Sequence, residues 1–405
     1  MICSKEMEPI NTANYRTSTF YGPRIDIQAL SYVDDLNSPV SKAVTEKVVA
    51  NVNHLEIRKK MSVNMDKSSY LVINKKKNEN TEIKSTVNKG KIKLAKEQEY
   101  LGTWINEKAS CRFNIEKRIA KSKAVTSKIE KMTCPSRVGN LSVALKLELY
   151  SVVQISVLLY NLSAWAKWTK SDIDMLERFQ ANTLKRLLKL PVSTPNLGLL
   201  WETGIWRISD EILYKQIMLL HNIMKSESRR LIRQIIIEQN NHPIPNCWLE
   251  NLKERAGVVG YNINIEEIAT RTKTSLKKEV KEILHANFVK YVNQNSTTKL
   301  RTVIMNSFSR RKYINEGMLN DYEIKLVMLT RLHMIELKSN LKKGESNECQ
   351  FCKEENETTE HILQCKKIEY LKENLKFENV EITHDDSQTS KKIAKFIDRL
   401  RRIMI

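Results

Sequence analysis

Apolar side chains recur every three or four positions along most of the chain, and few residues interrupt them. Between residues 112 and 132, one face carries Ile115, Ile119, Val125, Ile129 and Met132. A spacing near 3.6 residues is that of an amphipathic α-helix. The 405 residues include only 10 glycines and 8 prolines, the residues that most often end helices. The sequence therefore predicts a mainly α fold with long helices, and not a loop-rich β architecture.

The periodic stretches give expected element positions. We expect helices over residues 41–61, 112–132, 141–168, 171–189, 207–240, 265–292 and 320–342, and a charged helical tail over residues 366–405. The helix over 171–189 is expected to be capped by Ser171, because Asp172 and Asp174 follow in its first turn. Apolar β-formers predict a hairpin over residues 24–37 and extended segments at 69–73 and 100–105. Strands and a helix in this order predict a small α/β layer near the N-terminus.

Two adjacent carboxylates lie at the tip of the expected hairpin, in Tyr32-Val33-Asp34-Asp35. Adjacent carboxylates repel each other, so burial raises their pKa unless a cation lies between them. Mg²⁺, a hard ion with oxygen ligands, is the natural partner. Two such ions that hold the attacking and leaving oxygens are the core of nucleotidyl transfer. The alternative interpretation of the tetrapeptide is a solvated turn without a metal.

The spacing Cys349-x2-Cys352-x8-His361-x3-Cys365 predicts a metal site near the C-terminus. A Cys-x2-Cys turn directs two thiolates toward one point, and His361 and Cys365 face the same side of a helix. Thr358 or Thr359 is expected to cap that helix. Four protein ligands make a closed, structural zinc site with no open position for catalysis. The alternative is a set of unrelated thiols and a core histidine.

The remaining cysteines do not cluster, and the first residues, Met1 to Lys5, lack the apolar run of a signal peptide. We therefore expect a reducing, intracellular compartment, in which cysteine clusters bind metals more often than they form disulfides. No stretch reaches the length of a membrane span. The most apolar one, residues 152–168, contains Gln154, Asn161 and Lys167.

The formal net charge of +21 favours a polyanionic partner, which we expect to be nucleic acid rather than an acidic membrane surface. In the helix over 112–132, basic residues lie largely opposite the apolar face: Lys117, Arg118, Lys121, Lys128 and Lys131. Such a helix packs by its apolar stripe and offers its basic side to phosphates. The alternative is a basic face that is only solvated.

The order of these motifs resembles the later part of a reverse transcriptase of the non-LTR (LINE-type) retrotransposon class. The hairpin with YVDD, the helix after it and the segment Asn64 to Tyr70 resemble the late palm, and Tyr100 to Ile105 resembles the segment that contacts the primer strand. Residues 187–195 and 199–204 resemble the helical region beyond the thumb. The Cys-Cys-His-Cys knuckle, preceded by a leucine-rich helix near Arg331-Leu332-His333, is similar to the C-terminus of these proteins. The resemblance covers about residues 25–370.

The resemblance implies roles for particular residues. Asp34 would be a catalytic metal ligand with Asp35 as its weaker companion, and Lys67 a candidate acid for the departing pyrophosphate. Tyr100, Gly102 and Trp104 would contact nucleic acid at the primer turn. The implied reaction is attack of a DNA primer 3′-hydroxyl on a deoxynucleotide, directed by an RNA template and two Mg²⁺ ions. The implied localisation is the nucleus or the cytoplasm.

The sequence departs from the family at its start. The palm of such a polymerase needs a further carboxylate, which in this family lies many tens of residues before the hairpin, and only 33 residues precede Asp34. We therefore expect a truncated or fragmentary copy, inactive by itself as a polymerase. The expected domains are a partial palm (1–108), a thumb and helical connector (109–240), a helical linker region (241–342), a zinc knuckle (343–370) and a charged helical tail (371–405).

Two further hypotheses remain open. A basic, non-catalytic nucleic-acid-binding protein with a structural zinc knuckle would use the helices and the knuckle to bind RNA or a DNA–RNA hybrid, and Asp34 would have no chemical role. A purely structural helical protein would explain the leucine stripes, but neither the charge nor the knuckle.

Overall fold

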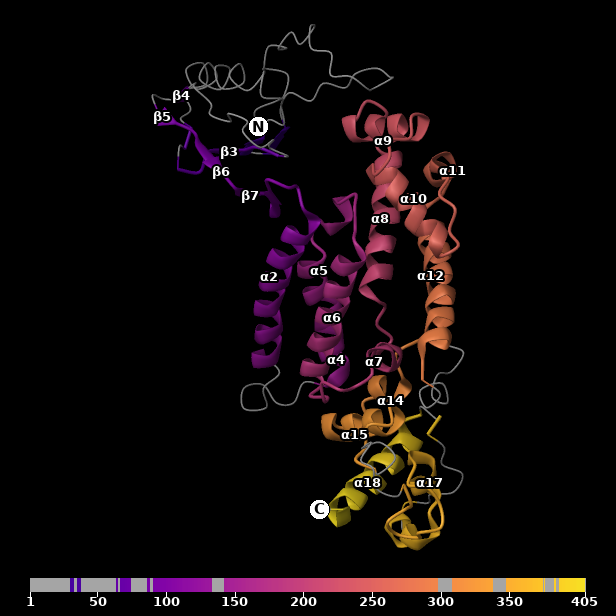
Figure 1. Ribbon diagram of the computed structural model, residues 1–405. Helices are drawn as coiled ribbons and strands as arrows, with labels where there is room; N and C mark the ends of the chain where they lie inside the picture. Colours follow the sequence, from indigo (N-terminus) through magenta and orange to yellow (C-terminus); the bar gives the residue numbers. More distant parts are fainter. Residues whose placement is uncertain are drawn as a thin grey trace. The chain divides into compact units, whose positions relative to one another are not determined.

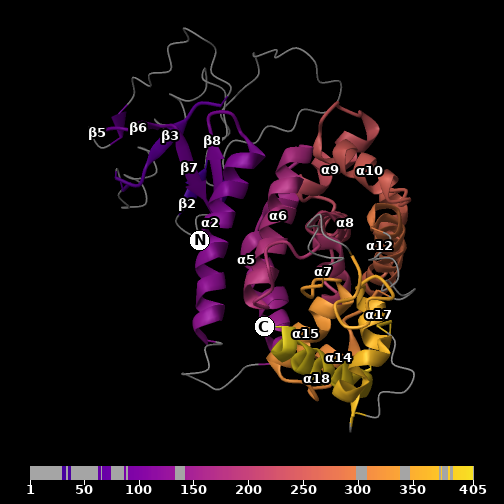
Figure 2. The same ribbon diagram turned by 60° about the horizontal axis from the view of Figure 1, so that its bottom comes forward.

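The structure is a computed structural model (Figures 1 and 2), and it describes most of the chain after residue 90. The described residues are 30–32, 35–37, 63–64, 66–73, 86–87, 90–132, 142–297, 308–337, 347–373, 375, 382–383 and 386–404. The fold is mainly α within these ranges, as the sequence predicts. The helix expected over residues 41–61 lies outside the described residues.

The chain divides into two compact units, and each is described by itself. Unit 1 contains Met1–Lys117, Trp165–Lys167 and Ile223–Asn251, and unit 2 contains Arg118–Ala164, Trp168–Asn222 and Leu252–Ile405. Among the described helices, three have residues in both units: α2 (Cys111–Met132), α8 (Ile208–Lys225) and α10 (Trp248–Val258).

In the part of the chain that the structure describes, the strands lie in unit 1 as four short pairs. The elements are β1 (Leu30–Tyr32), β2 (Asp35–Asn37), β3 (Ser69–Leu71), β4 (Thr86–Val87), β5 (Gly90–Lys91), β6 (Lys93–Ala95), β7 (Glu97–Tyr100) and β8 (Thr103–Asn106). The pair β3–β6 is parallel, whereas β1–β2, β4–β5 and β7–β8 are antiparallel. Tyr32 lies opposite Asp35, so two residues connect β1 to β2, as in a tight hairpin. The hairpin expected in residues 24–37 is therefore confirmed where the backbone is described.

A second hairpin replaces the single extended segment expected at residues 100–105. Leu101 (φ 46°) and Gly102 (φ 75°) form its turn, and both lie in the left-handed region. Two consecutive positive φ angles define a type I′ turn, whose twist matches that of the strands it joins. Gly102 adopts this conformation without the steric cost that a Cβ atom adds at Leu101. The bend expected at Gly102 is present, but it connects two strands rather than interrupting one.

The helix expected over residues 207–240 is two helices, α8 and α9 (Leu231–Asn241). Between them, residues 226–230 have the sequence Ser-Glu-Ser-Arg-Arg and offer no apolar side chain to bury. The hydroxyl of Ser226 donates to the carbonyl of Ile223 (2.6 Å), which competes with continuation of the helix. Without an apolar face, a helical turn gains little from packing.

Helices make up most of the described part of unit 2. They are α4 (Val143–Leu149), the π-helical turn η1 (Tyr150–Gln154), α5 (Ile155–Leu158), the 3-10 turn η2 (Leu162–Ala164), α6 (Lys170–Leu187), α7 (Asn196–Thr203), α11 (Ile265–Thr270), α12 (Lys273–Asn295), α14 (Lys312–Asn315), α15 (Asp321–Arg331), α17 (Thr359–Gln364), the 3-10 turn η3 (Lys366–Lys372) and α18 (Ser387–Met404). In both views α15 and α18 lie side by side (Figures 1 and 2).

Several boundaries in unit 2 differ from the expected ones. The helix expected over 141–168 ends at Leu158, and Asn161 (φ 56°) then adopts the left-handed conformation that asparagine tolerates. The stretch 265–292 is divided into α11 and α12, because Thr272 begins a new helix as its N-cap. The stretch 320–342 contains α15, which ends at Arg331 and is followed by His333 in the left-handed region (φ 53°).

The core of unit 2 holds aromatic residues from distant segments and a buried ion cluster. Rings of Trp201, Phe288 and Phe308 have centroids 4.7–6.2 Å apart. Beside them, Glu202 accepts hydrogen bonds from Arg331 Nε (2.9 Å) and from the Tyr313 hydroxyl (2.7 Å). These interactions join α7 to α14 and α15. Within the described residues, no helix combines the length and the apolar composition that a membrane crossing needs.

Candidate functional site

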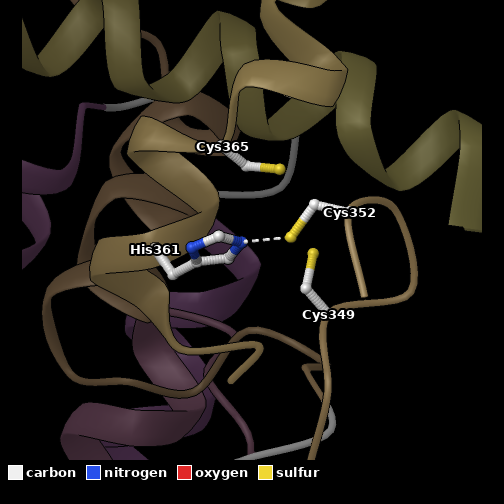
Figure 3. Close-up of side chains that lie close together, drawn as sticks. All are labelled: Cys349, Cys352, His361 and Cys365. Atoms are coloured by element: carbon white, nitrogen blue, oxygen red, sulfur yellow. Dashed lines mark hydrogen bonds between the residues drawn. The ribbon is translucent and has the colours of Figure 1, made fainter. Parts of the chain in front are cut away.

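Four side chains converge near the C-terminus of unit 2, and all four are those that the spacing predicts. The ligand atoms of Cys349, Cys352, His361 and Cys365 all lie within 4.8 Å of one another. Figure 3 shows the three sulfur atoms and the imidazole directed toward a common point. Cys352 Sγ lies 3.3 Å from His361 Nε2. The cysteines come from the loop before α17 and from its end, and the histidine comes from α17 itself.

This donor set fits a zinc ion. A tetrahedral site with bonds of about 2.3 Å to sulfur and about 2.0 Å to nitrogen places its ligand atoms roughly 3.5–3.8 Å apart. The ligand atoms of the cluster, all within 4.8 Å of one another, lie close to that size. Three thiols and one imidazole suit zinc better than Mg²⁺ or Ca²⁺, which prefer oxygen ligands. The cluster can therefore hold a metal such as zinc with four protein ligands.

The loop that carries Cys349 and Cys352 forms a tight turn. The N–H of Lys353 donates to the carbonyl of Cys349 (2.9 Å), and Lys353 has a positive φ of 59°. The N–H of Glu354 is 3.5 Å from Cys352 Sγ, and the N–H of Cys349 donates to the carbonyl of Glu355 (2.7 Å). An antiparallel bridge between Glu348 and Asn356 closes the base of the loop.

The histidine is oriented by residues that are not ligands. Its Nδ1 lies 3.0 Å from Glu355 Oε2, which leaves Nε2 to face the cysteines. A carboxylate in this position fixes the ring and raises its basicity as a ligand. Thr358 caps α17, because its hydroxyl accepts from the N–H of His361 (3.1 Å). The spacing predicts the ligands, and of the two expected caps, Thr358 and Thr359, the structure uses Thr358. Glu355 carries no signal in a segment with several glutamates.

The thiols differ in their surroundings. Backbone N–H groups, that of Glu354 first, lower the pKa of the Cys352 thiol to about 7. Burial raises the pKa of the Cys365 thiol to about 11. Cys349 and Cys365 are 0% and 2% exposed, respectively. A metal ion that binds here must therefore displace protons, so binding couples to pH and to folding of the segment.

The segment with the four candidate ligands is attached to the helices of unit 2. His333, at the end of α15, has its Nδ1 3.2 Å from the hydroxyl of Thr359 in the first turn of α17. Arg399 of α18 donates to the carbonyls of Leu371 (2.7 Å) and Glu373 (3.0 Å) at the end of η3. The segment is thus part of the packing of unit 2.

The expected Mg²⁺ site lies mostly outside the described residues. Asp34 is among the residues that the structure does not describe, and Asp35 is described only as a backbone position in β2. Lys67 is described, and it lies in an exposed turn before β3. The carbonyl and side-chain oxygens of Asn64 accept from the Lys67 N–H, both at 3.2 Å, and hold this turn.

The residues expected at the primer turn lie together in unit 1. Tyr100 and Gly102 belong to the β7–β8 hairpin, and the N–H of Trp104 donates to Asn114 Oδ1 in α2 (3.0 Å). The Lys117 ammonium lies 4.4 Å from the centroid of the Trp104 ring and 3.0 Å from Glu97 Oε1. The hairpin is therefore fixed to the first turns of α2 by a hydrogen bond and by a cation–π contact.

The basic side of α2 is less uniform than the sequence suggests. Lys121 and Lys128 are exposed, whereas Arg118 is only 5% exposed and its guanidinium lies 4.4 Å from the ring centroid of Tyr160. Residue 118 follows Ile115 by three positions and therefore shares its buried face. The expectation that Arg118 lies on the solvated side is wrong, and we leave it out of the candidate nucleic-acid surface.

Comparisons with known proteins identify no relative of this chain: no family model, no curated protein and no solved structure matches it.

Proposed function

We propose that this chain is the C-terminal part of a non-LTR (LINE-type) retrotransposon reverse transcriptase that binds an RNA template and a DNA primer. The observation that carries the proposal is the pairing of Tyr32 with Asp35, which sets YVDD across a hairpin with a two-residue connection. A polymerase whose adjacent aspartates lie at the turn between two strands needs a tight hairpin at this position. The Cys₃His cluster, the hairpin anchored on α2 and the charge of +21 support the same assignment.

In this proposal, Asp34 and Asp35 supply one part of an Mg²⁺ cage. The remaining carboxylate would come from a segment upstream of the hairpin, which the 405 residues do not contain in the form that the resemblance requires. Nucleotidyl transfer depends mainly on charge neutralisation and on positioning by both metal ions. The 405-residue chain alone is therefore expected to bind a primed template without extending it. The zinc site would have a structural role.

A second function is favoured by the closed geometry of the zinc site and by the exposed lysines of α2. A basic nucleic-acid-binding protein without chemistry needs only these two features. Both functions predict salt-sensitive binding of a primed RNA template. With about six to ten phosphate contacts, affinity falls by roughly 10³–10⁵ between 50 and 200 mM salt.

Metal binding at the hairpin separates the two functions. Mn²⁺, which is paramagnetic and replaces Mg²⁺, can be titrated into the purified chain and followed by electron paramagnetic resonance. The polymerase proposal predicts a weak site that Asp34→Ala removes. The matched control is Asp66→Ala, which changes an exposed aspartate in a turn.

Two results would contradict the proposal. Equal Mn²⁺ binding by wild type and Asp34→Ala would favour the binding protein without chemistry. Templated, Mg²⁺-dependent extension by the 405-residue chain alone, lost in Asp34→Ala, would show that the metal cage is complete without an upstream segment.

A further inference from the structure

A cavity of about 760 Å³ opens within unit 2, and residues of η1, α5, α8 and α12 line it. It lies apart from the zinc cluster, and the sequence motifs do not point to it. Its wall combines the aromatic residues Trp206, Tyr214 and His285 with the cationic residues Lys281 and Arg310. Its volume falls in the range of roughly 300–1,000 Å³ that small-molecule sites occupy.

The aromatic wall is held in place by the core. Trp206 and Tyr214 are half-buried, and their ring centroids are 6.5 Å apart in an edge-to-face arrangement. The backbone of Trp206 is fixed by the buried Gln180, whose Nε2 donates to the Trp206 carbonyl (2.8 Å). Gln180 also accepts from the N–H of Ile208 at the start of α8 (3.2 Å). The backbone at Trp206 is therefore held, and the contact between the two rings restrains their side chains, which lowers the ordering cost of binding a planar ligand against them.

Cationic side chains flank this wall. Lys281 is exposed on α12, and its ammonium lies 5.8 Å from the centroid of the Tyr214 ring. One turn earlier, Lys277 and Lys278 are also exposed. Arg310 also lines the cavity; its Nε donates to the carbonyl of Thr203 (3.4 Å), and its Nη1 lies 3.7 Å from Glu148 Oε2. A negatively charged backbone that passes over α12 would thus meet several positive charges in succession.

The cavity also contains carboxylates, which limit the kind of ligand. Glu211 is half-buried, lies 3.9 Å from Lys215 and has its pKa raised by burial. Glu282 is exposed. Carboxylates disfavour a ligand made only of phosphates, but they accept hydrogen bonds from the amino groups of bases. A nucleotide offers both a flat base with such groups and a phosphate.

We propose that this cavity holds one unpaired nucleotide of a single-stranded nucleic acid, with its base against Trp206 and Tyr214 and its phosphate beside Lys281 and Arg310. Positively charged grooves with aromatic side chains are the general means of binding single strands, because every base has a π-face. A base in a duplex is not free to stack in this way. The inference rests on the proposed function, since that function supplies the nucleic acid.

The test uses the full chain and a single-stranded RNA of about 20 nucleotides that carries 4-thiouridine, a photo-crosslinking base, at successive positions. Crosslinks are mapped by mass spectrometry, and affinity is measured by fluorescence anisotropy. We expect crosslinks at Trp206 or Tyr214. Trp206→Leu should weaken binding of the single strand about 5- to 150-fold and leave binding of the matching duplex unchanged.

Lys281→Gln provides a second variant that does not disturb the core, because its side chain is exposed. Log affinity falls linearly with log salt concentration, and the loss of one phosphate contact should make this negative slope shallower by about 0.7 for a single strand. The matched control is Lys290→Gln, an exposed lysine on the same helix that does not line the cavity. Its slope should equal that of the wild type.

The outcomes separate the two proposals. If the chain binds the single strand but Trp206→Leu and Lys281→Gln bind like the wild type, or if crosslinks fall elsewhere, the cavity is not a nucleotide site and the proposed function stands. If the chain binds no nucleic acid at all, the proposed function fails and this inference fails with it.

Discussion

At the scale of single residues, the left-handed Gly204 fixes the end of α7 against a distant segment. Gly204 has φ 64°, and a Cβ atom added there would lie 2.2 Å from the backbone nitrogen of Arg310. No side chain fits at residue 204, because the atoms that it would meet belong to the backbone of residues 309 and 310. We predict that Gly204→Ala lowers the free energy of unfolding by about 2–5 kcal/mol, from left-handed strain and overpacking together.

Gly257 in α10 is the matched control, since a Cβ atom there meets nothing within 4 Å. Gly257→Ala should raise the free energy of unfolding by about 0.5–1 kcal/mol, because alanine costs less entropy in a helix. Denaturant titrations of both variants give the comparison. Equal stability of Gly204→Ala and wild type would mean that residues 204 and 310 are not in contact in solution.

A second prediction at this scale concerns the buried hydroxyl of Tyr313. Burial raises the pKa of Tyr313, so its hydroxyl stays protonated and donates to Glu202 Oε2 (2.7 Å). Glu202 and Tyr313 are 1% and 0% exposed. Tyr313→Phe removes a hydrogen bond to a buried charged group and should cost about 1.5–3 kcal/mol.

Tyr322 provides the control for Tyr313, because its hydroxyl also donates to a carboxylate, that of Asp398 (2.9 Å), but its side chain is exposed. Tyr322→Phe should change stability by less than about 0.5 kcal/mol. Thermal and urea unfolding of the two variants test the difference. Similar losses for both would show that the hydroxyl of Tyr313 is hydrated in solution.

At the scale of elements, the start of α6 distinguishes two neighbouring hydroxyl residues. Thr169 is the N-cap, because its hydroxyl accepts from the N–H of Asp172 (3.2 Å) and the Asp172 carboxylate accepts from the N–H of Thr169 (3.1 Å). The cap is therefore Thr169, whereas the sequence predicts Ser171. Thr169→Ala should cost about 0.5–2 kcal/mol. Ser171→Ala, an exposed change in the first turn, should stay within about 0.5 kcal/mol.

The two capping variants are compared by helix content and by urea midpoint. A larger loss for Ser171→Ala than for Thr169→Ala would restore Ser171 as the cap and shorten α6. The ambiguity has a physical origin. Both hydroxyls precede an acidic residue at a plausible distance, and only the direction in which the chain enters α6 decides which one can cap it.

Elements whose determinants are local were predictable from the sequence. The helix expected over residues 112–132 and the observed α2 differ by a single residue, and the Cys-x2-Cys turn and the pair His361 and Cys365 bring the ligands together as their spacing requires. What the sequence could not provide depends on tertiary contacts. Glu355 becomes a partner of His361 only because the loop folds back, and the cavity beside Trp206 exists only where α8 and α12 meet.

At the scale of the whole molecule, specific contacts join the Cys₃His segment (residues 347–373) to the helices of unit 2. Thr359 contacts His333, α18 packs on α15, and Arg331 of α15 donates to Glu202 of α7. A metal that folds residues 347–373 should therefore stabilise unit 2 as a cooperative whole. At zinc concentrations near 100 times the dissociation constant, binding adds about 2.7 kcal/mol to the free energy of unfolding. For a unit of this size, that corresponds to a rise in Tm of about 5–10 °C.

We therefore predict that a strong zinc chelator lowers the main melting transition of the chain, measured by circular dichroism at a helix wavelength. Cys365→Ser should melt at the lower temperature and no longer respond to chelator. Cys247→Ser, at a half-buried cysteine outside the cluster, should respond like the wild type. If chelation instead produced a separate small transition and left the main one unchanged, the segment would fold independently of α15 and α18. The contacts through His333 and Arg399 would then contribute no coupling, because cooperativity requires that the loss of one part weaken the other.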